Sequence, residues 1–129
     1  MGTKTITISK QTTNTNLYVT DSEGNAGTTI TTVAKRGDTI VWQLQPGGGI
    51  DQITGIIKKS VSGSVDVFSS QPAPINPKDP QTAWKGSISQ NASGREYYDI
   101  AYIIKGANFI CDPVIEIEEE GKEIFSSEN

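Results

Sequence analysis

Apolar and polar residues alternate over short stretches of the chain, and no stretch shows the 3.6-residue period of a helix. The clearest alternation is in Thr39–Leu44, where Ile40, Trp42 and Leu44 fall on one face of a strand. Turn-forming Gly, Asn, Asp and Ser recur about every ten residues. The pattern therefore predicts an all-β chain of about eight or nine strands, folded as an antiparallel β-sandwich.

The densest apolar and aromatic stretch is Gly94–Ile117, which predicts two strands joined by a short loop. Tyr98, Ile100 and Tyr102 share one face at the strand period. The second strand is expected to begin after Asp112-Pro113, and the pair would form the centre of the sandwich. Other strands are predicted at Thr3–Ser9, Leu17–Val19, Thr28–Ala34, Thr39–Leu44, Ile53–Ile57, Val65–Phe68 and Trp84–Ile88.

Proline and charge divide the rest of the chain. Four of the six prolines lie in residues 71–81, which therefore predicts an extended crossover and not an interior strand. From Glu116 onward there are six Glu and one Lys, whereas residues 1–115 carry a net charge of only +1. We therefore expect a single sandwich domain over residues 1–117, followed by an acidic C-terminal tail over residues 118–129.

Composition limits the function classes. The chain of 129 residues is 34% hydrophobic, which suits one domain with a solvated face on each sheet. The single cysteine, Cys111, excludes an internal disulfide, and no run approaches the roughly 18 apolar residues of a membrane span. The nearly neutral body does not favour nucleic-acid binding. The N-terminus lacks the apolar segment of a signal peptide, so we expect a cytoplasmic protein, with secretion after processing as the alternative.

Two segments resemble a known fold family. The segment Val33–Trp42 carries a valine, then Gly37-Asp38, then an apolar-x-aromatic pair, and the late Gly-x-x-Tyr-Tyr-x-Ile-x-Tyr strand precedes a terminal Pro-x-Ile-x-Ile strand. This order resembles cupredoxin-like domains, and it implies a sandwich of the cupredoxin or immunoglobulin-like Greek key type. Blue-copper sites need two imidazoles and a thiolate, and the sequence has no histidine. The resemblance therefore implies the scaffold without its metal, and we expect no cofactor.

A second resemblance lies in the ending Phe109–Ile117, an aromatic residue followed by Asp112-Pro113 and alternating apolar positions. It is similar to the closing strand of bacterial inclusion-body proteins of the AidA type. That resemblance implies a non-catalytic protein that accumulates in the cell.

The candidate chemistry is weak. Without histidine, Ser-His-Asp and Cys-His catalysis are impossible. Asp99 and Asp112 are the carboxylates that a glycosidase would need, but capping and solvent-facing roles explain them better. The spacing of Asp21, Glu23 and Asn25 resembles the start of a calcium loop, yet it fits a turn better. We therefore expect that the protein is not an enzyme.

Self-association is the function that the sequence favours. Ile124 and Phe125 are apolar anchors in an otherwise polar tail, and the Thr-rich stretch with Thr28, Ile30 and Val33 would form a self-pairing edge. The expected partner is therefore a further copy of the chain, in a homo-oligomer. The alternative is a monomeric module that binds a glycan or peptide at an aromatic site formed by Trp84, Lys85 and Tyr97.

Overall fold

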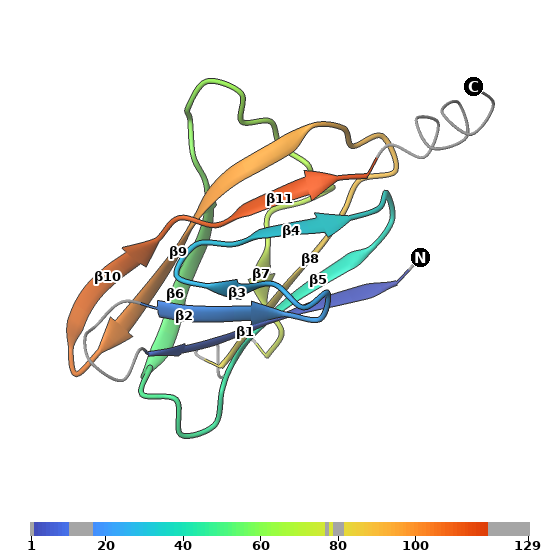
Figure 1. Ribbon diagram of the computed structural model, residues 1–129. Helices are drawn as coiled ribbons and strands as arrows, with labels where there is room; N and C mark the ends of the chain where they lie inside the picture. The colour runs from blue at the N-terminus through green and yellow to red at the C-terminus, as the bar shows by residue number, and fades with distance from the viewer. Residues whose placement is uncertain (1, 11–16, 77, 79–81, 119–129) are drawn as a thin grey trace.

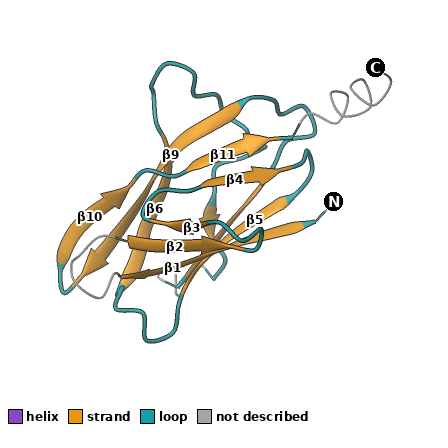
Figure 2. Cartoon of the chain, in the orientation of Figure 1, coloured by secondary structure: helices purple, strands orange, loops and turns teal. Residues whose placement is uncertain are grey.

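The computed structural model describes residues 2–10, 17–76, 78 and 82–118, and these form two packed β-sheets (Figure 1). The described residues include eleven strands and no helix (Figure 2), so the all-β sandwich is confirmed with more strands than predicted. The strands are β1 (Thr3–Lys10), β2 (Leu17–Asp21), β3 (Ala26–Gly27), β4 (Thr31–Ala34), β5 (Thr39–Leu44), β6 (Gln52–Lys58), β7 (Ala73–Pro74), β8 (Ala83–Ser87), β9 (Arg95–Ile104), β10 (Ala107–Cys111) and β11 (Val114–Ile117).

One sheet has six strands in the order β3-β2-β1-β5-β8-β7, and the other is built around β9. Ile100 of β9 pairs with Ile56 of β6 and also with Cys111 of β10, so these two strands flank β9 on opposite sides. On the side of β10, the chain continues through Asp112-Pro113 into β11, which pairs with the beginning of β9 and then with β4. The second sheet therefore has β9 at its centre.

Both sheets are mixed, although a wholly antiparallel sandwich was predicted. β1 pairs in parallel with β5, and β11 pairs in parallel with β4. Parallel neighbours require a long connection between them. The chain supplies one by changing sheets: β4 belongs to the five-stranded sheet, whereas β3 before it and β5 after it belong to the six-stranded sheet.

The predicted central hairpin is present, but its second arm starts earlier than expected. Lys105 (φ 50°) and Gly106 (φ 82°) form the turn, because glycine tolerates positive φ readily. The second arm then runs as β10 and, after a break at Asp112-Pro113, as β11. The proline has no backbone N–H, so it interrupts the ladder at this point.

The strand predicted at Val65–Phe68 is absent as a regular strand. Only two isolated bridges occur there, from Ser64 to Arg95 and from Phe68 to Ile88. Carboxylates take the backbone donors that a ladder would use: Val67 N donates to Glu96 Oε1 at 2.9 Å, and Phe68 N donates to Asp66 Oδ1 at 3.2 Å. Side-chain acceptors have replaced strand pairing in this segment.

The core lies between the two sheets, and Trp42 and Tyr98 are at its centre. Trp42 Nε1 on β5 donates a hydrogen bond to Tyr98 Oη on β9 over 3.1 Å, and both side chains are fully buried. Their rings meet edge to face with centroids 5.8 Å apart, and the Phe68 ring lies 5.7 Å from that of Trp42. The alternation predicted for Tyr98, Ile100 and Tyr102 is confirmed, since all three point into this core.

Buried carboxylates fix two of the turns. Asp21 Oδ1 accepts hydrogen bonds from the N–H groups of Glu23 and Asn25, while Oδ2 accepts one from Thr32 Oγ1 at 2.6 Å. Burial would raise the pKa of Asp21, but these hydrogen bonds outweigh it and hold the pKa below its usual value. Asp38 holds its own turn in the same way, accepting from Lys35 N at 2.9 Å. Asp21 therefore acts as a turn residue, as the sequence favoured.

Removing the hydroxyl group of Tyr98 tests the contact at the centre of the core. We expect Tyr98→Phe to lower the free energy of unfolding by about 1–3 kcal/mol, because Trp42 Nε1–H would be left buried without an acceptor. Urea unfolding followed by tryptophan fluorescence measures the change. Tyr18→Phe, the same substitution at an exposed tyrosine of β2, is the control and should change stability by less than about 0.5 kcal/mol. Equal effects of the two substitutions would contradict the role given to this hydrogen bond.

Candidate functional site

The outer face of the five-stranded sheet carries an exposed apolar patch. Ile57 on β6 is 54% exposed and Ile110 on β10 is 63% exposed. Between them, Ala101 of β9 pairs with Ile110 on one side and with Gly55 on the other. A Cβ at Gly55 would lie 3.1 Å from Ile57 Cδ1, so the Ile57 side chain covers this glycine. We call Gly55, Ile57, Ala101, Ile103 and Ile110 the outer apolar patch.

The edges of the two sheets are protected to different degrees. The six-stranded sheet ends in β3 and β7, which have only two residues each, and β7 contains Pro74. In the other sheet, β6 carries a register irregularity between Ile53 and Gly55. Short strands, prolines and bulges all hinder pairing with another chain. By contrast, β10 has five residues without charge or proline, and among the described strands it pairs with β9 alone.

The predicted association edge lies partly where it was expected. β4 ends the five-stranded sheet, and Val33 on it is 37% exposed. Thr28 is also exposed, but it precedes β4. Ile30 is only 5% exposed and packs in the core, because β4 and the residues before it lie over the interior of the sandwich. Ile124 and Phe125, the other predicted association residues, lie outside the described part of the chain, as does the acidic tail after Glu118.

The residues of the predicted aromatic site are not brought together. Trp84 pairs with Trp42 and is partly buried against the core, so the next residue, Lys85, points to the opposite face of β8. Tyr97 lies on β9 in the other sheet, on the outer face between the buried Glu96 and Tyr98. Trp84 follows the proline-rich stretch closely in the sequence, but this position does not show which face of β8 its side chain occupies.

The two carboxylates considered for glycosidase chemistry meet at a lysine. Lys59 Nζ lies 2.7 Å from Asp99 Oδ1 and 3.0 Å from Asp112 Oδ1. Hydrogen bonds to these carboxylates raise the pKa of Lys59, and the hydrogen bond from Lys59 lowers the pKa of Asp112. A general acid needs a raised pKa, whereas the pKa of Asp112 is lowered. The cluster therefore fits a structural ion pair that joins the end of β6 to β9 and to the start of β11 better than it fits catalysis.

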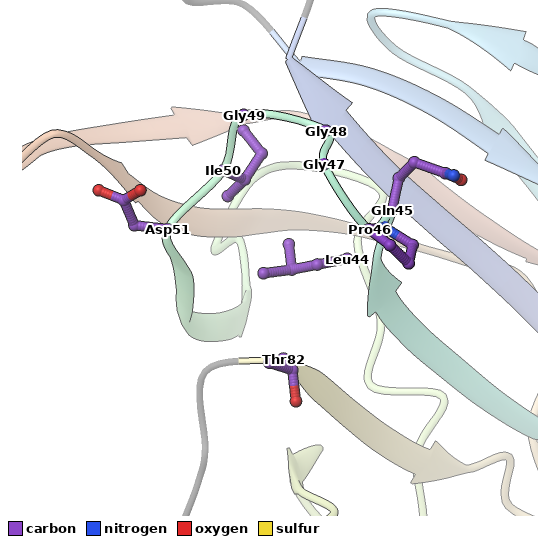
Figure 3. A pocket seen from close by; sticks show the side chains of 9 residues that line it. All are labelled: Leu44, Gln45, Pro46, Gly47, Gly48, Gly49, Ile50, Asp51 and Thr82. Atoms are coloured by element: carbon purple, nitrogen blue, oxygen red, sulfur yellow. The ribbon is translucent and has the colours of Figure 1, made fainter.

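A hollow of about 550 Å³ opens at the end of the sandwich where β5 ends and β6 begins (Figure 3). Leu44, Pro46 and Ile50 supply its apolar side chains, and the loop Gly47–Gly49 forms one wall. A Cβ at Gly48 would lie 2.9 Å from both Gln45 O and Ser9 Cβ, so no larger residue fits there without movement. Asp51 stands at the rim, and its Oδ2 accepts a hydrogen bond from Lys105 N at 2.7 Å. The hollow is therefore a preformed, mainly apolar recess with a carboxylate at its edge.

Two buried titratable side chains serve the fold. Burial raises the pKa of Glu96 to about 7, although the hydrogen bond from Val67 N opposes the shift. Burial also raises the pKa of Cys111 to about 11, and its Sγ donates a hydrogen bond to Thr28 O over 3.0 Å. A thiol with a raised pKa is a poor nucleophile.

The described residues lack both a membrane-spanning helix and a cluster of metal-ligating side chains. No helix among them has the length and apolar character needed to cross a membrane. No three acidic or cysteine side chains in the same ranges gather as they would around a metal ion.

Comparisons with known proteins identify a family and a similar fold. The model of a family described as a domain of unknown function, DUF8788, matches residues 3–109. No curated protein matches the chain. Among solved structures, the crystal structure of an inclusion body protein (PixA) from Burkholderia cenocepacia is similar with a TM-score of 0.54 and 12% identity, covering 91% of this chain and 95% of that chain.

At that identity the likeness shows the fold alone. It agrees with the inclusion-body resemblance that the ending Phe109–Ile117 suggested. The cupredoxin-like resemblance is not confirmed.

Replacing Glu96 tests its unusual environment. Because the pKa is raised above that of the unfolded chain, its contribution to stability is greatest below about pH 4 and is lost as the pH rises through about 7. Glu96→Gln keeps an acceptor for Val67 N but cannot ionise, so we expect it to remove this loss. Relative to the parent chain, its free energy of unfolding should be higher at pH 8 than at pH 4 by on the order of 1 kcal/mol. Urea unfolding across this range measures it, with the exposed Glu116→Gln as control. A constant difference between Glu96→Gln and the parent chain at every pH would contradict the assignment.

Proposed function

This chain belongs to the DUF8788 family, and we propose that it is a non-catalytic structural protein that works by associating with further copies of itself. The observation that carries the proposal is the contrast between the two sheets. The six-stranded sheet ends in short strands, one of them with a proline, whereas the five-stranded sheet has longer edges beside exposed isoleucines. Exposed apolar surface next to open strand edges is typical of an interaction surface. The fold shared with an inclusion body protein is consistent with this role.

The titratable groups support a non-catalytic role. The acids with shifted pKa values each have a structural partner: Glu96 holds Val67 N, Asp21 holds its turn, and Asp112 is ion-paired with Lys59. Perturbed pKa values also arise in structural networks, so the shifts alone do not indicate an active site. The hollow beside Leu44 has one rim carboxylate, which already accepts a backbone hydrogen bond.

A second candidate function rests on that hollow. An apolar recess with few polar groups is typical of a small-molecule site, and its volume of about 550 Å³ falls within the usual range for such sites. The ligand class would be a small apolar molecule, because Leu44 and Ile50 provide the contact surface. This replaces the site expected near Trp84, whose proposed residues lie on different faces.

Mass in solution tests self-association. We expect light scattering over a hundredfold range of concentration to show masses rising above the 13.8 kDa of a monomer. Truncation after Glu118 keeps the hydrogen bond from Glu118 N to Ala34 O while removing Ile124 and Phe125. A weaker association of this variant would support a role for the tail, and unchanged association would exclude it. A mass of 13.8 kDa at every concentration would contradict the proposed function.

Filling the hollow tests ligand binding. We expect the fluorescent apolar probe anilinonaphthalene sulfonate to bind saturably, and Ile50→Trp to weaken that binding by about tenfold because the larger side chain occupies the recess. Val61→Trp, which adds the same side chain at an exposed valine beyond the other end of β6, is the control and should leave binding unchanged. Unsaturable binding, or equal binding by both variants, would contradict a site in the hollow.

A further inference from the structure

β10 is an edge strand that is ready to pair with another strand. It spans Ala107–Cys111, and among the described strands only β9 pairs with it. In any strand, half of the backbone N–H and C=O groups point away from the neighbour on one side. Those on the free side of β10 can therefore accept a further strand without any change to the β9–β10 ladder.

The composition and the exposure of β10 both favour pairing with a further strand. Ala107–Cys111 contains no charge and no proline, the residues that commonly block pairing at edges. Phe109 points inward, where its ring stacks on Tyr102 with centroids 5.5 Å apart, so the inner face of the strand is already packed. Ile110 points outward and is 63% exposed, which makes it the most exposed large apolar residue of the described chain. A partner beside β10 would cover Ile110 and extend the outer apolar patch.

The charges that flank β10 select its partner. Lys105 precedes the strand and Asp112, which also pairs with Lys59, follows it; both residues are exposed. In an antiparallel pair of two copies, the lysine end of one strand meets the aspartate end of the other, and the two-fold symmetry creates this contact twice. A parallel pair would instead place like charges together. The strand is thus complementary to itself in the antiparallel direction.

Face and symmetry together limit the register, and we place the axis at Phe109, the middle residue of β10. A two-fold axis perpendicular to the sheet keeps outward residues opposite outward residues, as the alternation of strand side chains requires. Centring the axis on Phe109 places Asn108 opposite Ile110 of the second copy. In this register, Lys105 of each copy lies one residue away from the position opposite Asp112 of the other copy.

We infer that β10 of one copy pairs antiparallel with β10 of a second copy, joining two five-stranded sheets into one continuous sheet. The inference rests on the proposed self-association and names its interface. The rival edge, β4, is less suited to this role. It has four residues against five in β10, and its exposed apolar side chain, Val33, is 37% exposed against 63% for Ile110.

A charge on the free edge provides the first test. We expect Ile110→Lys to weaken self-association of the full chain at least about tenfold by sedimentation velocity, because an exposed lysine on an edge blocks pairing. Val61→Lys introduces the same charge at an exposed valine outside the strands, and Val33→Lys introduces it on β4. Neither should weaken association by more than about twofold. Equal thermal melting of the three variants shows that the fold is retained.

Cross-linking tests the register independently. In the inferred pair, Asn108→Cys together with Ile110→Cys places each new thiol opposite its counterpart in the second copy, within the roughly 4.4–6.8 Å Cα separation that a disulfide needs. We expect covalent dimers on mild oxidation, visible without reductant and absent with it. The double variant Ser22→Cys with Glu23→Cys, at two exposed positions of the Asp21–Asn25 turn, is the control and should give no covalent dimer.

The outcomes separate the two proposals. If the parent chain associates but Val33→Lys disrupts it and Ile110→Lys does not, the interface inference is overturned and the proposed function stands. If the parent chain remains at 13.8 kDa at every concentration, the proposed function fails. Association that depends on Ile110, without a cross-link between positions 108 and 110, would overturn the antiparallel register.

Discussion

The hydrogen bond between Trp42 and Tyr98 is the contact on which the arrangement of the two sheets depends. The side chains of Trp42 and Tyr98 are fully buried, so water cannot reach the indole N–H or the phenol O–H. Either group would destabilise the fold if it were left without a hydrogen-bond partner. Each side chain is held by its own strand, so the bond can form only at one relative position of β5 and β9 across the core. One polar contact therefore fixes the alignment of two otherwise apolar surfaces, and the edge-to-face packing of the two rings reinforces it.

The alternation that buries Tyr98 also creates the outer surface. Since Tyr98, Ile100 and Tyr102 face inward, the residues between them must face outward, and these are Asp99, Ala101 and Ile103. Ala101 lies between Gly55, which the Ile57 side chain covers, and the exposed Ile110. Asp99 contributes to the Lys59 ion cluster at one border of that area. Core and candidate interaction surface are thus two faces of β9.

Carboxylates in this protein act mainly on the backbone. Asp21, Asp38 and Glu96 are each buried, and each accepts hydrogen bonds from N–H groups of loops or turns. Such bonds compensate for the burial of charge, and they hold segments that strand pairing does not reach. The arrangement explains how a chain without described helices can fix long connections. The same burial and hydrogen bonds shift the pKa values of Asp21 and Glu96.

Local pattern was sufficient to predict the sandwich, the inward face of β9 and the turns at Asp21 and Asp38, because alternation and turn chemistry involve residues close in sequence. It also identified the Thr-rich stretch that contains β4 as an edge of a sheet. The parallel pairings, the irregular path of Val65–Phe68 and the inward position of Trp84 came only from the tertiary structure. Each depends on a partner distant in sequence: another sheet, the Glu96 carboxylate or Trp42. β10 shows both sides of this division. Its turn residues and uncharged run were visible in the sequence, but whether it is an open edge depends on which strands the rest of the chain places beside it.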